Sequence, residues 1–259
     1  SYLLRKPHIA FNDTEHADVI HKKMTYPFSD CICTPSCFYE YLGEKQIRFD
    51  SFMEYAYLHP NYFSMDQRIY NYLGVPRNEK FFLLRFVSWS ALHDQGHSGL
   101  DLATRRILVS NLLSYGKVFI SSEGSLEAEF EPFRLTLPPE LVHSCLAAAD
   151  LFIAESGTMA SESAILGTPV IYVNSLPLMG YLREEENQGL LFHFHNSVGV
   201  VNKATELVEG NYKQCAGALA EKLLHNKIDV TKFMVWLVEN YPESKKILSD
   251  NPQYQYNFL

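Results

Sequence analysis

Residues 151–173, LFIAESGTMASESAILGTPVIYV, decide the fold class of this chain. The apolar runs at the two ends of the stretch are short, rich in Ile, Val and Phe, and bounded by turn residues, as buried parallel strands are. Between them, Ser156 and Thr158 can each cap a helix. Gly167, with Pro169 two residues beyond, can end it. The stretch therefore predicts a strand, a tight turn, one short helix and a second parallel strand.

The start of this helix suits a phosphate group. Gly157 allows a close turn, and the first N–H groups of a helix lack intrahelical partners and lie at the positive end of its dipole. Glu162 follows Thr158 by four residues and shares its helix face, where an acid can accept hydrogen bonds from ribose hydroxyls. The pattern favours a nucleotide, although Ser-Gly-Thr is also an ordinary helix start that binds nothing.

Composition and charge set the broad class. The chain has 259 residues, 47% of them hydrophobic and 20% charged, which is ordinary for a globular protein that buries a sizeable core. Its net charge is −8, and Lys and Arg are nowhere concentrated, so we expect no nucleic-acid partner. No apolar run is long enough to span a membrane and no signal peptide opens the chain, which predicts a cytoplasmic location.

Three of the five cysteines cluster at Cys31, Cys33 and Cys37. Their spacing lacks the Cys-x2-Cys pairing that is typical of zinc sites, so we expect buried free thiols and no metal site. Abundant unpaired thiols fit a reducing compartment.

Strands and amphipathic helices alternate along most of the sequence, which indicates doubly wound parallel sheets. An aromatic connector, residues 49–63, separates two such series. We therefore predict a partial N-terminal Rossmann-like domain over residues 1–62 and a second Rossmann-like domain over 63–204 that binds the nucleotide. Residues 205–259 are expected to form helices and a tail that pack back on the first domain.

Ligands of such sheets bind outside the carboxyl ends of the strands, which selects particular loops. Arg85 lies inside an apolar strand, where its charge needs an anion or a buried acid as partner. His93 lies in the loop that follows. Asp13 and Glu15 follow the first strand, and Asp13 can simply cap the next helix. We expect the run 184–186, three glutamates, to form a solvated face.

Several motifs, in order, resemble an uncharacterised prokaryotic family of predicted glycosyltransferases. The resemblance spans residues 7 to about 200 and is carried by EHAD, GEKQIRFDSFMEYAYLHPNYF, LLRFVSW, LHDQG, FISSEG and ESGTMASESAILGTPVIYVNS. The family is related to the non-hydrolysing UDP-N-acetylglucosamine 2-epimerases and has the GT-B fold, two Rossmann-like domains facing across a cleft. Its members usually begin with an extra segment, so the resemblance implies an incomplete N-terminal domain in this chain.

The resemblance also implies roles for particular residues. The motif at 156–162 is similar to the donor motif of lipid A disaccharide synthase and of the epimerases, where the first residues meet the diphosphate and the acid meets the ribose. Glu162 would then hold the ribose and His93 would take the place of a catalytic histidine. The full expected set is Glu15, Asp13 and His93 for catalysis, with Arg85, Ser156, Gly157, Thr158, Glu162, Ser122 and Glu123 for nucleotide-sugar binding.

These residues predict a glycosyltransferase that uses a nucleoside diphosphate sugar, with a UDP-sugar favoured. Helix N–H groups and Arg85 would stabilise the departing diphosphate, and Glu15 or Asp13 would take the proton of the acceptor hydroxyl. Glu15 is the favoured base, because Asp13 is better placed to cap the helix. No Asp-x-Asp motif is present, so we expect no metal and no cofactor beyond the sugar donor itself. The acceptor would be a glycan or lipid-linked glycan, as in surface polysaccharide or glycolipid synthesis, which allows peripheral membrane contact. The alternatives are a UDP-sugar 2-epimerase and a non-catalytic nucleotide-sugar-binding module.

Overall fold

The structure, a computed structural model, describes residues 5–15, 19–87, 99–122 and 124–259. The chain divides into two compact α/β units. The smaller unit comprises Ser1–Asn61, Met179–Glu184 and Leu224–Leu259, and the larger comprises Tyr62–Leu178 and Glu185–Leu223. Both units contain a parallel sheet with helices on it, so the fold is α/β with two Rossmann-like parts.

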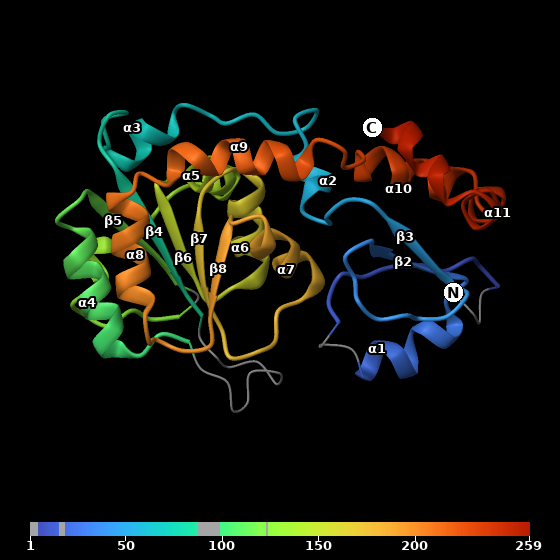
Figure 1. Cartoon of the computed structure of the whole chain (residues 1–259), viewed down its shortest axis with the longest axis horizontal. Helices are drawn as coiled ribbons and strands as arrows, with labels where there is room; N and C mark the ends of the chain where they lie inside the picture. Colours follow the sequence, from blue (N-terminus) through green and yellow to red (C-terminus); the bar gives the residue numbers. More distant parts are fainter. Residues whose placement is uncertain (1–4, 16–18, 88–98, 123) are drawn as a thin grey trace. The chain divides into compact units, whose positions relative to one another are not determined.

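The larger unit is built on a five-stranded sheet in which every pair of neighbours is parallel (Figure 1). Its spatial order is β5-β4-β6-β7-β8. The strands are β4 (Phe81–Phe86), β5 (Lys117–Ser122), β6 (Leu151–Ala154), β7 (Val170–Val173) and β8 (Leu191–Phe194). Strands β4, β6 and β7 are almost entirely buried, as expected for parallel strands covered on both faces.

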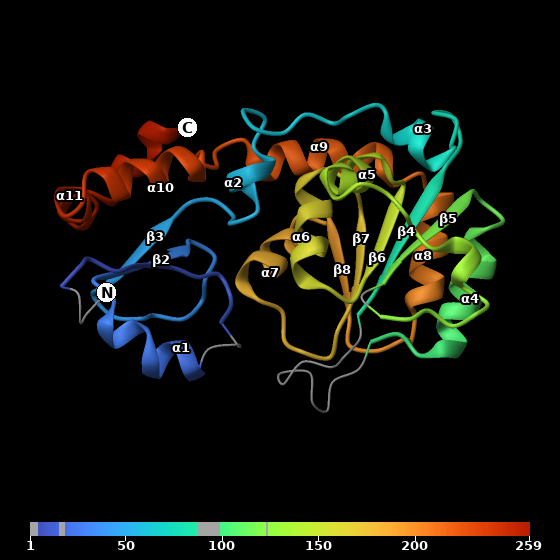
Figure 2. The same cartoon turned by 180° about the vertical axis from the view of Figure 1, so that it is seen from behind.

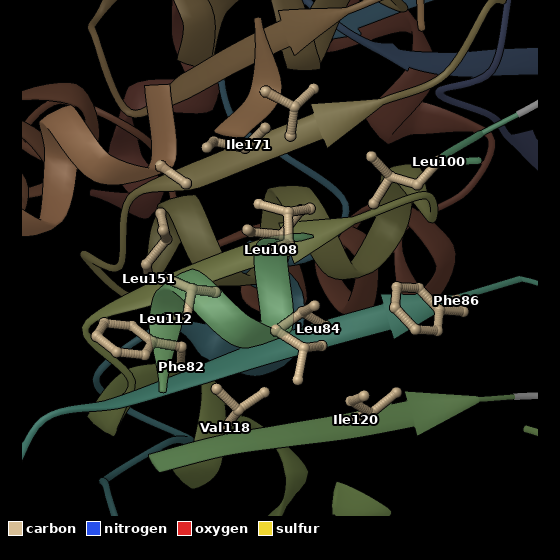
Figure 3. Close-up of a cluster of buried hydrophobic side chains, with 14 of the residues drawn as sticks. Phe82, Leu84, Phe86, Leu100, Leu108, Leu112, Val118, Ile120, Leu151 and Ile171 are labelled. Atoms are coloured by element: carbon tan, nitrogen blue, oxygen red, sulfur yellow. The ribbon is translucent and has the colours of Figure 1, made fainter. Parts of the chain in front are cut away.

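Helices cover both faces of this sheet (Figures 1 and 2). On one face, α4 (Leu102–Leu112) and α8 (Val200–Glu209) pack their apolar side chains on the strands and form the main core. Figure 3 shows this core, which includes Leu108 and Leu112 of α4 and Leu84 of β4. On the other face lie α5 (Val142–Ala148) and α6 (Gly157–Ile165). The unit also contains α3 (Ile69–Leu73) and α9 (Lys213–Leu224).

The deciding stretch folds as its sequence predicts. Helix α6 starts at Gly157 and ends at Ile165, followed by Gly167 in the left-handed conformation with φ 74°. A side chain at Gly167 would be strained in that conformation, and its Cβ would lie 3.0 Å from Gly217 Cα. The glycine therefore ends the helix and lets α9 approach closely.

The smaller unit holds a three-stranded parallel sheet in the order β1-β2-β3. The strands are β1 (Ile9–Phe11), β2 (Cys31–Pro35) and β3 (Gln46–Phe49), and the helices are α1 (Val19–Met24), α2 (Tyr55–Leu58), α10 (Val230–Glu239) and α11 (Glu243–Asp250), with a terminal 3-10 helix η6 (Pro252–Phe258). The tilted rings of Phe49 of β3 and Phe233 of α10 pack together in its core, with their centroids 5.8 Å apart. Helix α7 (Gly180–Asn187) gives its first residues to this unit and its last to the larger one.

Two smaller predictions can also be compared with the structure. Cys31 and Cys33 are free thiols buried in β2, as expected, whereas Cys37 is half-buried. Within the described part of the chain, no helix is both long enough and apolar enough to cross a bilayer.

Candidate functional site

The direction of the strand order reverses between β4 and β6. From β4 the chain passes through α4 to β5 on one side, and then returns through α5 to β6 on the other side of β4. Helix α4, which follows β4, and helix α6, which follows β6, lie on opposite faces of the sheet. Parallel α/β sheets bind ligands at such a reversal of strand order.

Helix α6 begins at this point. Ser156 is its N-cap in extended conformation, with φ −97° and ψ 122°, yet among the described residues its side chain makes no capping hydrogen bond. Ser156 and Gly157 are half-buried and Thr158 is exposed. The first intrahelical bond that serves this end runs from Ala160 N to Ser156 O, so the preceding N–H groups point out of the helix. Together these three residues present polar groups and a positive helix end at the edge of the sheet.

One turn further along α6, Glu162 meets a histidine that the sequence did not single out. His143 Nε2 and Glu162 Oε1 are 3.1 Å apart, and the two side chains come from the adjacent helices α5 and α6. The Glu162 side chain is 10% exposed and that of His143 is 33% exposed, so the pair lies at the surface of the unit. A ligand bound at the start of α6 can reach this face, because Thr158 and Glu162 are four residues apart on it.

The acid immediately before the motif has a different environment. Glu155 is buried, and its carboxylate accepts hydrogen bonds from Val87 N and Leu100 N, both at 2.8 Å. Arg105 of α4 also donates to it, at 3.1 Å. The carboxylate thus joins the end of β4 to the chain that leads into α4. The sequence analysis did not predict this role for Glu155. The signal was the alternation of side chains along a strand, which places Glu155 and Ala154 on opposite faces of the sheet.

Arg85 and Ser122 reach the same edge of the sheet. Arg85 pairs with Ser121 on one side and with Ala154 on the other, and its guanidinium donates to Ser121 Oγ at 2.7 Å. Ser122 ends β5, and its Oγ accepts a hydrogen bond from Gly124 N at 3.3 Å. The structure therefore brings Arg85 and Ser122 to the edge where α6 begins. His93 and Glu123, which we also expected here, lie outside the described residues.

The two acids predicted for catalysis lie in the smaller unit, after β1. Glu15 is buried, and its Oε1 accepts hydrogen bonds from Gly180 N at 3.0 Å and Tyr39 N at 3.2 Å. The approach is so close that a Cβ on Gly180 would lie 2.0 Å from Cys37 O. Glu15 therefore fastens two backbone segments together, and its role as a base stays a prediction.

Asp13 has fewer structural ties of this kind. Its Oδ1 accepts a hydrogen bond from the Thr14 hydroxyl at 2.9 Å. Burial raises the pKa of Asp13 above its ordinary value, and the hydrogen bond from Thr14 opposes that shift. A half-buried acid with a raised pKa has the property that a general base needs.

The expectation for the three glutamates of α7 was wrong. Glu185 is fully buried and accepts a hydrogen bond from Ser161 Oγ at 2.5 Å. Glu184 pairs with Lys227 at 2.7 Å, and Glu186 accepts from His193 N at 3.4 Å. Successive helical residues point about 100° apart, so three in a row cannot share one solvated face.

The two parallel sheets with their helices define an α/β protein with a GT-B-like fold, built from two Rossmann-like parts. The chain belongs to the family described as "Protein of unknown function (DUF354)", whose model matches residues 1–243. A search of curated proteins found no match.

Solved structures share this fold at low sequence identity. The UDP-GlcNAc 2-epimerase from Neisseria meningitidis bound to UDP-GlcNAc superimposes with a TM-score of 0.59 at 13% identity, over 92% of this chain and 71% of that one. A form of the wall teichoic acid polymerase TagF gives 0.50 at 14% identity, over 88% of this chain and 61% of that one. The S. aureus MnaA structure with UDP gives 0.49 at 14%, over 78% and 61%. This chain therefore spans about three fifths of the length of two of these proteins.

Proposed function

We propose that this protein is a glycosyltransferase that takes its sugar from a nucleoside diphosphate donor, with a uridine nucleotide favoured. The observation that carries the proposal is the start of α6 at the reversal of strand order, with Glu162 one turn along the same helix face. In support, the Neisseria epimerase of the same fold was solved with UDP-GlcNAc bound. The acceptor is proposed to be a glycan or a lipid-linked glycan.

In this proposal the larger unit holds the donor. The N–H groups of Gly157 and Thr158, with the Ser156 hydroxyl, bind the diphosphate, and Glu162 accepts hydrogen bonds from the ribose. Arg85 stabilises the negative charge that builds up on the departing diphosphate, which needs no metal ion. Ser122, Glu123 and His93 complete the donor side.

The base that deprotonates the acceptor is proposed to come from the smaller unit. Glu15 and Asp13 are the two candidates, and the contacts favour Asp13. The Glu15 carboxylate accepts hydrogen bonds from two backbone N–H groups and is buried, so it is held as part of the scaffold. Asp13 is only half-buried, and burial raises its pKa.

A UDP-sugar 2-epimerase is the second candidate function, favoured by the likeness of the fold to the Neisseria epimerase. A module that binds nucleotide sugars without turnover is the third. Incubation with UDP-GlcNAc separates the three: a transferase releases UDP slowly by hydrolysis, an epimerase returns an isomerised sugar, and a binding module leaves the donor unchanged.

The binding step is tested first, by thermal unfolding with a series of nucleoside diphosphates. A uridine diphosphate should raise the melting temperature of the protein, and Gly157→Val should remove this effect while the variant stays folded, because the added side chain occupies the place of the phosphate. The matched control is Gly217→Val in α9, where a Cβ meets nothing within 4 Å. An unchanged ligand effect in Gly157→Val, or no effect of any nucleotide on the unmodified protein, would refute the proposed site.

A further inference from the structure

The pair formed by His143 and Glu162 is a built feature that the donor site described above does not explain. A carboxylate only accepts hydrogen bonds, so His143 Nε2 is the donor in the 3.1 Å contact with Glu162 Oε1. The bond turns one carboxylate oxygen toward α5. A carboxylate can accept roughly four hydrogen bonds, so Glu162 can serve His143 and a ligand hydroxyl together.

His143 is itself held in place from its other side. The ring of Phe63 stands edge-on to the imidazole, at 90° and with the centroids 6.2 Å apart. The segment that carries Phe63 is fastened to α5 by Ser144, whose buried hydroxyl accepts a hydrogen bond from Asp66 N at 2.9 Å. These contacts fix the imidazole between an aromatic ring and the carboxylate.

If the His143–Glu162 pair served only to hold α5 and α6 together, it would not need to lie near the start of α6. The two helices already pack on each other, and Thr168, in the turn between α6 and β7, donates its hydroxyl proton to Leu146 O of α5 at 2.7 Å. The His143–Glu162 contact lies closer to solvent, because the His143 side chain is 33% exposed, although that of Glu162 is only 10% exposed. It also lies one turn from the exposed Thr158, on the helix face that starts at the proposed phosphate site.

We infer that His143 is a positioning residue that holds the Glu162 carboxylate toward the ribose hydroxyls of the donor, so that the pair selects ribonucleotides. The inference rests on the proposed function, since it concerns the sugar of the nucleotide bound at the start of α6. A glutamate has several rotatable bonds, and fixing it before the ligand arrives removes part of the entropy that binding would otherwise cost. Loss of the fixing partner should therefore weaken the recognition of the ribose and leave the recognition of the phosphates intact.

The experiment compares two ligands, UDP and 2′,3′-dideoxyuridine diphosphate, by titration calorimetry. The protein should bind UDP at least tenfold more tightly than the dideoxy compound. His143→Leu should reduce this ratio to within about threefold and leave the affinity for the dideoxy compound unchanged. His143→Gln, whose amide can donate from a similar place, should keep most of the ratio. Adding His143→Leu to Glu162→Ala should change nothing further, because residues that act through one another are not additive.

The possible outcomes separate this inference from the proposed function. Failure of the unmodified protein to bind either nucleotide would refute both. A second outcome is that both nucleotides bind and that Gly157→Val removes their binding, but that His143→Leu keeps the preference for UDP. This outcome would refute the role of His143 and leave the proposed function standing. An equal loss of both affinities in His143→Leu would show a structural role in its place.

Discussion

The two edges of the five-stranded sheet carry similar charged residues but use them differently. At the amino edge, Asp150, just before β6, accepts a hydrogen bond at 2.9 Å from the N–H of Phe81, the first residue of β4. Lys213 donates to Ala147 O at 2.8 Å and also to the hydroxyl of Thr168. Each of these contacts joins one element of the scaffold to another.

At the carboxyl edge only one of the two acids is used in this way. Glu155 fastens the backbone at Val87 and Leu100, as Asp150 does at the opposite edge. Glu162 instead contacts the side chain of His143, which is 33% exposed. An acid near a strand end is therefore a candidate for function when its partner is a partly exposed side chain, and a part of the scaffold when its partners are backbone N–H groups.

The largest effect is expected at Glu155. Glu155→Ala removes the acceptor of two buried N–H groups and leaves the Arg105 guanidinium without its buried partner, so the free energy of unfolding should fall by about 3 to 5 kcal/mol. Urea unfolding measures this change. The control is Glu127→Ala, because Glu127 lies 3.7 Å from the same arginine but is 39% exposed, and its loss should cost under about 1 kcal/mol. Equal costs for the two variants would break the distinction between scaffold and surface acids.

The second largest effect is expected at Lys213, at the amino edge of the sheet. Burial lowers the pKa of Lys213 from 10.5 to about 8, and the charge of Asp150 opposes the shift. Between these two pH values the folded protein has released this proton while the unfolded chain still holds it, so stability rises with pH in this window. From the shift, the contribution of Lys213 over the window is about 3 kcal/mol.

The measurement is urea unfolding of the unmodified protein and of Lys213→Met from pH 7 to 10.5. Other thiols and phenols titrate in this range, and the difference between the two proteins cancels their effects. The unmodified protein should gain stability relative to the variant above pH 8. Lys222→Met, an exposed position on the same helix, should follow the unmodified protein throughout. If the difference in the free energy of unfolding between the unmodified protein and Lys213→Met does not change with pH, the ammonium group of Lys213 is not desolvated.

A smaller effect is expected at Glu162, and only with ligand. Without nucleotide, Glu162→Ala should change the free energy of unfolding by less than about 1 kcal/mol, in contrast to Glu155→Ala. At UDP concentrations of about 100 times the dissociation constant, the unmodified protein should gain roughly 2.7 kcal/mol, and the variant should lose most of this gain. Glu140→Ala, which removes an exposed acid just before α5, is the charge-matched control. Equal ligand effects in the Glu162 and Glu140 variants would contradict the ribose assignment.

The sequence predicted the elements of this edge better than the roles of its acids. Gly167 and Pro169 mark the end of α6 through local backbone chemistry, which one stretch of sequence contains. The pairing of Glu162 with His143 depends on how α5 is rotated against α6, and that rotation is set by packing. The same limit explains Glu15, whose partners at Tyr39 and Gly180 are remote in sequence.

The two acids after β1 in the smaller unit differ in the same way as Glu155 and Glu162 in the larger one. Glu15 faces backbone N–H groups, as Glu155 does, whereas Asp13 has a hydroxyl as its partner. Glu15→Gln weakens two hydrogen bonds to a buried carboxylate, so it should lower the free energy of unfolding by about 1 to 3 kcal/mol.

Asp13→Asn should have the opposite sign at neutral pH. Burial raises the folded-state pKa of Asp13, so the charged form costs stability above its unfolded pKa, and removing the charge leaves stability unchanged or slightly higher. A residue that lowers stability but is needed for turnover is typical of an active site. If Asp13 is the base, Asp13→Asn should also lower the rate of sugar transfer or donor hydrolysis by roughly 10² or more, with nucleotide affinity within about twofold. Urea unfolding and donor turnover are measured for both variants. Full turnover in Asp13→Asn, together with a loss of turnover in a folded Glu15→Gln protein, would assign the base to Glu15. Acids with backbone N–H partners would then not be confined to the scaffold in the smaller unit.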